Sequence, residues 1–567
     1  MNQQGWIVAV LFMLSAGFVK AENSPRLSTW NDKNLAAWWQ ANPDPATWNS
    51  AAADLKLALL NAQERYDLEK VFENDHFRGW LVHTRWLELF DVESASDGEL
   101  QAFRALSLKM EIPRLFVSSL DARDDAEKAL KNLIGIAVGN PESIFHYPEL
   151  AVAFSVVFDQ PFPEAWPHPF TKQNWLMLGN PDPAERFGFM ISSIEKKQLL
   201  LDPSDLSVRE LTFAVDSPVD LNEFIYAQQV KLASPASLAA LYPAVKYDFP
   251  RAQKGNFMWP HGENYHLFEI GKRGGICADQ AFFVSQTAKS KGVPALFFLG
   301  QGRSGGHAWV GFLSKRGKWE LDVAKYRGEK YPVGVAYDPQ TWRRITDSQF
   351  RFLIKELVTT GRYESMQLTL QWAAMNRDAP FYRGLLRHAR KFMPRYFSTW
   401  ELEAELLEKE TDAEVKEKFW RDWTLNFREE TDLRTRGQVA LLQLFRDAGD
   451  DREAERLEQE IFRENKSERF DLAIKVAAET IFLEMDREHW EDAAKEFDSK
   501  LSRFRKDSGG HLFYNLVQPY VERCIAAGKR EMAAAAVGEL DNFFKPQANS
   551  MLDQDIATLR QQVTSVK

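Results

Sequence analysis

Residues 274–300 read GGICADQAFFVSQTAKSKGVPALFFLG, and this stretch contains the change of secondary structure that decides the fold. After Gly275, the run ICADQAFFVSQTAKSKG has a helical pattern that ends at Gly292, a residue type that commonly terminates helices. The apolar run PALFFLG (294–300) then predicts a strand. Cys277 is therefore expected in the first turn of a helix that leads into a sheet.

Three further β-like runs follow: HAWVGFL (307–313), KWELDVA (318–324) and VGVAYD (333–338). The short turn SKRGK (314–318) predicts that the first two runs form a hairpin. One helix followed by several strands predicts an α+β domain over residues 246–345.

Helical patterns dominate on both sides of this domain, over residues 22–245 and 346–567. In the first region, apolar side chains recur at helical spacing from Asn49 to Arg65, and Asp125 is expected to cap a second helix. Proline disfavours helix interiors. Three proline-rich segments are therefore expected to be loops: NPDPATW (42–48), DQPFPEAWPHPF (159–170) and GNPDPAERF (179–187).

Three helix pairs are expected near the C-terminus, each an apolar helix followed by one rich in acidic and basic residues. The second helices begin in DDREAERLEQEIF (450–462), REHWEDAAKEF (487–497) and GKREMAAAAVGEL (528–540). Aligning Ala454, Ala493 and Ala534 gives steps of 39 and 41 residues. This pattern resembles tetratricopeptide-like helical-hairpin repeats, and a plain helical bundle is the alternative.

Length and charge limit the classes of protein that the chain can represent. Its 567 residues predict about three or four domains. The formal net charge of −10 argues against a nucleic-acid partner, because nucleic-acid binders usually present a basic face.

The N-terminal segment has the pattern of an export signal. Ile7–Val19 is an apolar run of 13 residues, too short to span a bilayer, and Val19-Lys20-Ala21 suits a signal peptidase. Residues 1–21 are therefore predicted to be a signal peptide, and the protein is expected to be secreted or periplasmic, with no membrane attachment after cleavage.

Three residues of the central domain form a catalytic pattern. A thiol at a helix N-terminus, as expected for Cys277, lies near the positive end of the helix dipole, which favours the nucleophilic thiolate. His307 is the first residue of the second predicted strand after this helix, and its imidazole can serve as a base. Asp322 lies 15 residues further on, and the hairpin could place it beside His307 to orient the imidazole.

The segments GGICADQA, GVPALFF, GGHAWVGF and WELDVA together resemble the transglutaminase-like core of the papain-like thiol enzymes, over about 100 of the 567 residues. The resemblance implies an α+β transglutaminase-like core flanked by large all-α regions. It implies Cys277 as nucleophile, His307 as general base and acid, and Asp322 as orienting carboxylate. The implied reaction forms a thioester from a carboxamide or peptide carbonyl and resolves it with water or an amine, without a cofactor.

One feature departs from the family pattern. Many relatives carry proline directly after the aspartate, whereas Val323 follows Asp322. Asp338 is followed by Pro339, so Asp338 is the alternative third member.

The oxyanion site is less well defined by the sequence. The backbone N–H of Cys277 is one expected donor. Trp259, through its indole N–H, is the candidate for the second donor, with His261 and Tyr265 behind it in the cleft.

No metal site is expected, because the sequence near Cys277 has no paired cysteine or histidine spacing. Cys524 lies in an apolar helix and is expected to pack there. Two free thiols are expected, and a single disulfide is the alternative.

The segment GQGRSG (300–305) satisfies the G-x-G-x-x-G pattern of a dinucleotide-binding turn. That turn must open a helix, and the run HAWVGFL is strand-like, so no dinucleotide is expected. The expected partners are a protein or peptide substrate and a second protein on the C-terminal helices. A catalytically degenerate core in a helical-repeat binding scaffold is the alternative function.

Overall fold

The computed structural model describes residues 32–65, 68–163, 168, 181–254, 257–262, 265–302, 306–326, 331, 333–359, 362–466, 469–504, 509–546, 548 and 550–565. The predicted signal peptide, residues 1–21, and part of the proline-rich segment 159–170 lie outside these ranges. Within them, no helix has the length and apolar character needed to cross a membrane.

The chain divides into two compact units. The first comprises Met1–Ser118 with Gln367–His388, and the second comprises Ser119–Met366 with Ala389–Lys567. The sequence-based boundaries at 245 and 345 do not coincide with this division. Gln367–His388 follows the sheet in the sequence but belongs to the first unit. In that unit the Trp372 ring lies 6.0 Å from the Phe77 ring.

The described part of the first unit is helical. Its helices, including those that cross its boundaries, are α2 (Asp32–Ala41), η2 (Pro45–Thr47), α3 (Trp48–Arg65), α4 (Leu68–Glu73), α5 (Asp75–Glu88), α6 (Asp97–Ser107), α7 (Glu111–Ser119), α20 (Tyr363–Ala374) and α21 (Tyr382–Phe392). The helix predicted from Asn49 to Arg65 is confirmed as α3. The segment 42–48 contains the 3₁₀-helix η2 and the first residue of α3, so it is not entirely a loop.

In the second unit, the helices before the sheet are α8 (Ala126–Gly139), α9 (Ser143–His146), α10 (Pro148–Val157), α12 (Pro183–Glu195), η3 (Pro203–Asp205), α13 (Val208–Val215), α14 (Leu221–Gln228), η4 (Pro235–Ala240), α15 (Leu241–Ala244), α16 (Phe249–Gln253), α17 (Leu267–Arg273) and α18 (Cys277–Ser290). The predicted cap of α8 is confirmed, since Asp125 accepts a hydrogen bond from the Lys128 N–H at 3.1 Å. The predicted loop 179–187 is wrong in its second half. Helix α12 begins at Pro183, where proline is tolerated because no helical carbonyl would accept its N–H.

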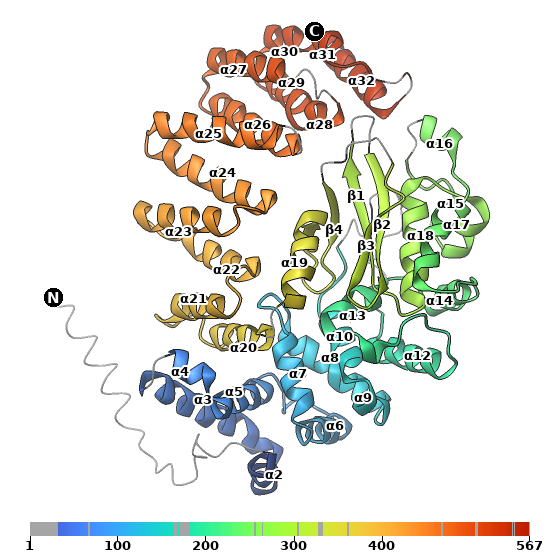
Figure 1. Ribbon diagram of the computed structural model, residues 1–567, viewed down its shortest axis with the longest axis vertical. Coiled ribbons are helices and arrows are strands. Elements are labelled where there is room, and N and C mark those ends of the chain that lie inside the picture. The colour runs from blue at the N-terminus through green and yellow to red at the C-terminus, as the bar shows by residue number, and fades with distance from the viewer. Residues whose placement is uncertain are drawn as a thin grey trace, which may run out of the picture. The chain divides into compact units, whose positions relative to one another are not determined.

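A five-stranded antiparallel sheet forms the centre of the second unit. Its strands are β1 (Ala295–Gln301), β2 (Gly306–Lys315), β3 (Lys318–Val323), β4 (Gly334–Tyr337) and β5 (Arg344–Thr346), in the order β3-β2-β1-β4-β5. The four predicted strands and the β2–β3 hairpin are confirmed, and β5 is additional. Helix α18 lies against β1 and β2 (Figure 1) and packs on the face that carries Ala308, Val310 and Phe312. The coarse expectation of an α+β centre with large helical regions is therefore correct.

The described part of the second unit after the sheet is helical. Its elements are α19 (Asp347–Thr359), α22 (Phe397–Leu407), α23 (Ala413–Asn426), α24 (Thr431–Asp447), α25 (Asp451–Asn465), α26 (Phe470–Asp486), α27 (Trp490–Arg503), α28 (Gly510–Leu512), the π-helical turn η6 (Phe513–Val517), α29 (Gln518–Ala526), α30 (Arg530–Gly538), α31 (Leu540–Phe543) and α32 (Met551–Ser565). From α23 onward, Figure 1 shows successive neighbouring helices, drawn from orange to red. The three predicted helix pairs are present as α24–α25, α26–α27 and α29–α30.

The turns within these pairs share one geometry. Gly449, Glu488 and Gly528 have positive φ angles of 71°, 63° and 71°, and the next residue's N–H bonds back to the carbonyl five positions earlier. These turns repeat at steps of 39 and 40 residues. The alignment on Ala534 is therefore wrong by one position, because the buried equivalent of Ala454 and Ala493 is Ala533.

Replacing Glu488 by glycine is expected to stabilise the protein by about 1 kcal/mol, because Glu488 is an exposed non-glycine residue in the left-handed conformation. Urea unfolding followed by circular dichroism measures the change. The matched control is Gly528→Ala, where an added Cβ meets nothing within 4 Å, so only the backbone cost of about 1 kcal/mol remains. Destabilisation by Glu488→Gly would contradict the shared turn geometry.

Candidate functional site

A glycine turn places Cys277 at the first residue of α18. Gly274 has a φ of 83°, and a Cβ there would collide with the carbonyl oxygen of Lys246. A Cβ on Gly275 would collide with the Asp279 side chain. Both glycines are therefore required by close packing, and the turn fixes where α18 begins.

A buried polar network supports this turn from below. The Asp279 carboxylate accepts hydrogen bonds from Arg251 Nη1 at 2.6 Å, from the Tyr265 hydroxyl at 2.9 Å and from the Ile276 N–H at 2.8 Å. The Tyr265 hydroxyl also bonds to Nε2 of His168 at 2.7 Å. Burial raises the pKa of Asp279, and Arg251 is the strongest influence in the opposite direction. The network ties the first turn of α18 to residues far earlier in the chain.

Tyr242 joins the start of α18 to β2. Its hydroxyl donates to the carbonyl oxygen of Ala308 at 2.7 Å and lies 3.3 Å from the carbonyl oxygen of Cys277. Cys277 is therefore held beside the residue that follows His307. Sequence reasoning missed Tyr242, because no motif connects it with either element.

The environment of the Cys277 thiol differs from that expected of a helix N-terminus alone. Burial raises the pKa of the thiol. A hydrogen bond from the Ala308 backbone N–H acts in the opposite direction, and the nearby Asp279 carboxylate raises the pKa further. These influences together favour the neutral thiol, whereas the helix dipole alone predicted an activated thiolate.

At pH 7, iodoacetamide is expected to alkylate Cys277 more slowly than it alkylates glutathione, because a raised thiol pKa leaves less thiolate. The rate should rise about tenfold per pH unit up to the pKa of the thiol. Mass spectrometry of the Cys277 peptide measures this rate. Cys524 is the internal control: it is fully buried, and burial raises its pKa to about 11, so it should stay unmodified. Faster labelling than glutathione at pH 7 would contradict this description.

His307 is buried and oriented by a backbone carbonyl. Its Nε2 lies 2.8 Å from the carbonyl oxygen of Ala324, and its ring stacks on Tyr326 at 3.9 Å between centroids. A carbonyl oxygen can only accept, so Nε2–H is the donor and Nδ1 is the basic nitrogen of the neutral ring. Ala324 has a φ of 70°, a strained value for a residue with a Cβ. The strain turns its carbonyl toward the imidazole.

The structure does not bring the thiol and the imidazole into a hydrogen bond. Ala308 packs against α18, and the His307 ring lies against Tyr326 and Tyr331, with 3.9 Å and 5.4 Å between the ring centroids. Among the residues that the structure describes, no hydrogen bond joins the Cys277 thiol to the His307 ring. Tyr326 is close to both, since it stacks on His307 and interacts electrostatically with Cys277.

The predicted His307–Asp322 pair is not formed. Asp322 is half exposed and is paired with Lys325 at 3.2 Å and with Arg351 at 2.8 Å. Val310 pairs with Val323 in the hairpin, and continuing this pairing along the two segments places His307 opposite Tyr326. Asp322 lies four residues before Tyr326, so it is roughly 13 Å from His307 along the strand direction, at about 3.3 Å per residue.

Comparisons with protein-family models, curated proteins and solved structures found no match to the chain. The transglutaminase-like resemblance remains a hypothesis that rests on the four quoted motifs.

The remaining candidates occupy other positions. Asp338 forms a two-point ion pair with Arg209, so it is engaged away from His307. Trp259 is buried against Tyr265, and Tyr265 is itself fully buried, so neither lines an open cleft. His261 is exposed, and its ring lies 5.0 Å from the Trp259 ring.

One further group of chemical interest lies before α18. Among the described residues, Asp220, Glu223 and His266 bring potential metal-ligating atoms within 4.8 Å of one another. This group is separate from Cys277 and was not indicated by any paired spacing in the sequence.

Proposed function

We propose that this protein is a thiol acyl-transfer enzyme of the transglutaminase-like type, with Cys277 as nucleophile and His307 as general base and acid. The observation that carries the proposal is the Tyr242 bridge. It holds the first residue of α18 against Ala308, the neighbour of His307 on β2. A thiol at a helix start and a histidine on the adjoining strand are the arrangement that such chemistry uses.

The first half-reaction forms a thioester. Nδ1 of His307 takes the Sγ proton as the sulfur attacks the carbonyl carbon of a carboxamide or peptide. The tetrahedral intermediate collapses when the imidazolium gives its proton to the leaving amine. The backbone N–H of Cys277, at the start of α18, is the proposed donor to the oxyanion.

The second half-reaction releases the acyl group. His307 takes a proton from water or from an amine, which attacks the thioester carbon, and the Cys277 thiolate leaves and is reprotonated. The thiol starts as a neutral group, so His307 must act during the attack rather than hold a preformed ion pair. The proposal has the hydrogen bond between Nδ1 and the thiol form as the substrate binds, as catalytic hydrogen bonds commonly do.

The surroundings of the thiol favour an apolar segment of a protein or peptide substrate. Tyr247 and Tyr326 both interact electrostatically with Cys277, and the exposed Phe249 ring lies 4.8 Å from the Tyr247 ring. Aromatic side chains of this kind bind apolar groups beside a reacting carbonyl. Secretion or a periplasmic location remains part of the proposal.

Asp322→Asn is expected to change the rate by less than about threefold, because the Ala324 carbonyl, and not Asp322, faces Nε2 of His307. Loss of the orienting carboxylate in a Cys-His-Asp triad would instead cost roughly 10⁴ in kcat. Steady-state amine incorporation separates the two values. A drop beyond about a hundredfold would show that the pair forms during turnover.

Amine incorporation tests the proposed reaction itself. The purified protein is incubated with a fluorescent primary amine and a glutamine-rich acceptor protein, beside Cys277→Ala and the control Cys524→Ala. Incorporation that requires Cys277 alone supports transfer. Release of ammonia or peptide fragments without incorporation identifies a hydrolase. If the protein yields neither an incorporated amine nor a hydrolysis product, the proposal of acyl-transfer chemistry is refuted.

A binding scaffold with a degenerate core is the second candidate, and two observations favour it. The Cys-His-Asp set is not assembled, and the C-terminal helix α28 contacts the last residue of β1. In that contact His511 Nε2 lies 2.5 Å from the Gln301 carbonyl oxygen. For such a scaffold, affinity capture would recover the same protein partner with the wild type and with Cys277→Ala, and no turnover would be measured.

A further inference from the structure

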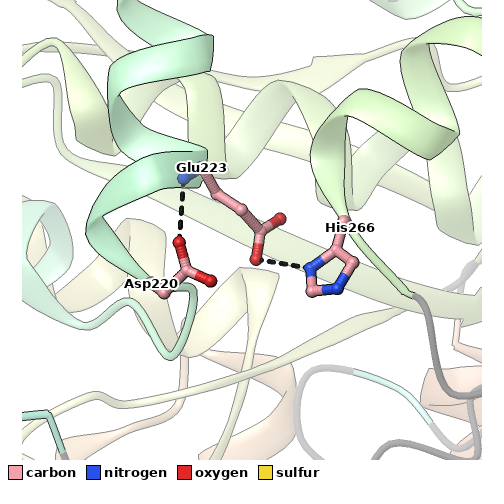
Figure 2. A group of neighbouring side chains, drawn as sticks. All are labelled: Asp220, Glu223 and His266. Carbon is pink, nitrogen blue, oxygen red and sulfur yellow. Dashed lines mark hydrogen bonds and ion pairs between the residues drawn. The ribbon is translucent and has the colours of Figure 1, made fainter.

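Asp220, Glu223 and His266 converge from the starts of two helices. Figure 2 shows Glu223 between the other two side chains, with its carboxylate directed toward His266. Asp220 and Glu223 come from the cap and first turn of α14, and His266 is the residue directly before α17. His266 Nδ1 lies 3.1 Å from Glu223 Oε1, and the ligand atoms of all three lie within 4.8 Å of one another.

The carboxylates of Asp220 and Glu223 face each other, and among the described residues no hydrogen-bond donor bridges them. Asp220 uses one oxygen to accept from the Glu223 N–H at 3.0 Å, and its other oxygen is directed toward the Glu223 carboxylate (Figure 2). Glu223 is buried, and its second oxygen accepts from the Leu267 N–H at 2.7 Å. Like charges in such proximity attract a cation.

The cation already present does not bond to either carboxylate. Arg186 is buried and interacts electrostatically with Asp220 and Glu223, but its Nη2 donates to the carbonyl of Val219. Among the described residues, Arg186 forms no ion pair or hydrogen bond with Asp220 or Glu223. Arg186 also interacts electrostatically with Glu185, so one guanidinium faces three carboxylates, and the resulting net charge of −2 matches that of a divalent ion.

We infer that Asp220, Glu223 and His266 form a binding site for a divalent transition-metal ion of the Zn²⁺ or Mn²⁺ class. Imidazole and carboxylate ligands together suit these ions, whereas Ca²⁺ and Mg²⁺ prefer oxygen ligands alone. Two ligand atoms of one tetrahedral zinc lie about 3.3 Å apart, close to the Glu223–His266 separation. The exposed side chain of Asp220 can turn to complete the set.

The site has an entrance and a fixed imidazole. Glu223 is buried, His266 is partly exposed and Asp220 is exposed, so the group opens to solvent on one side. The His266 ring stacks on Phe268 at 5.3 Å with 9° between the planes, which fixes its orientation. His266 also directly follows Tyr265, a member of the network below Cys277. A bound ion would therefore join α14 to the segment that supports the glycine turn.

Manganese titration of the full-length protein tests the site, because Mn²⁺ binds poorly to the thiols of Cys277 and Cys524. The free Mn²⁺ signal in electron paramagnetic resonance should fall by one ion per chain, and added Zn²⁺ should restore it. His266→Ala and Asp220→Asn should each weaken binding at least tenfold. Asp220→Asn keeps the helix cap, so its loss of binding would not reflect unfolding.

His489→Ala is the matched control, because His489 pairs with Glu484 at 2.9 Å without a second carboxylate. It should bind Mn²⁺ like the wild type. The inference is overturned if the wild type binds neither ion, or if His266→Ala and Asp220→Asn bind as the wild type does. Zn²⁺ binding that is lost only in Cys277→Ala would place the ion at the thiol and would equally overturn it.

Discussion

Replacing Arg251 by alanine is expected to destabilise the protein by about 3–5 kcal/mol, because Asp279 would be left as a buried charge without its counter-ion. Arg251 and Asp279 have side chains that are 4% and 0% exposed, so water cannot replace the lost partner. Urea unfolding followed by circular dichroism gives the apparent free energy of unfolding. Since Asp279 also holds the Ile276 N–H, the variant should loosen the first turn of α18.

The double variant Arg251→Ala with Asp279→Asn is the matched control, because it removes the charge that Arg251 neutralises. It should recover a large part of the loss, and simple additivity of the two single changes would show that the pair is not coupled. The loss in Arg251→Ala should also shrink at lower pH. Burial raises the pKa of Asp279, and without Arg251 the pKa rises further, so the folded state gains a proton more readily than the unfolded chain. Stability linked to this group is present at low pH and is lost as the pH rises through the folded pKa.

His307→Ala is expected to lower kcat for amine incorporation by roughly 10²–10⁴, with a much smaller change in KM, because the residue moves protons and does not anchor the substrate. The exposed His146 provides the control, and His146→Ala should leave both constants unchanged. A loss confined to KM would assign His307 a binding role and would contradict its role as general base.

Local sequence patterns were sufficient to predict the helix and the strands that surround Cys277 and His307. The helix after Gly275 and the four strands follow from the helical pattern, the glycine punctuation and the short apolar runs, which are properties of neighbouring residues. The β2–β3 hairpin follows from a turn of a few residues. These features depend on contacts near in sequence, so the sequence shows them directly.

Contacts between distant residues could not be predicted in the same way. The position of Asp322 depends on the hairpin register, and a shift of a few residues moves a side chain by more than 10 Å. Tyr242 lies 35 residues before Cys277 and Arg251 lies 28 residues before Asp279. Near Cys277, the sequence offered one local sign of the Arg251 contact, the acidic residue Asp279 two positions after the cysteine.

The group around Glu223 was missed for a related reason. A search for paired cysteine or histidine spacings finds ligands that neighbour one another in sequence, but His266 is 43 residues from Glu223. The spacing of Asp220 and Glu223 is a local signal that could have indicated two neighbouring carboxylates, since positions three apart share a helix face. The period of the C-terminal helices was predicted almost correctly, and the turns at Gly449, Glu488 and Gly528 now define it.

The most direct measurement of the central claim is the intact mass of the protein after brief incubation with an activated acyl ester, followed by peptide mapping. We predict one acyl group on the peptide that contains Cys277, sensitive to hydroxylamine as a thioester is, and absent in Cys277→Ala. An unmodified wild-type protein, or an acyl group that persists in Cys277→Ala, would contradict the proposal that Cys277 is an acyl-transfer nucleophile.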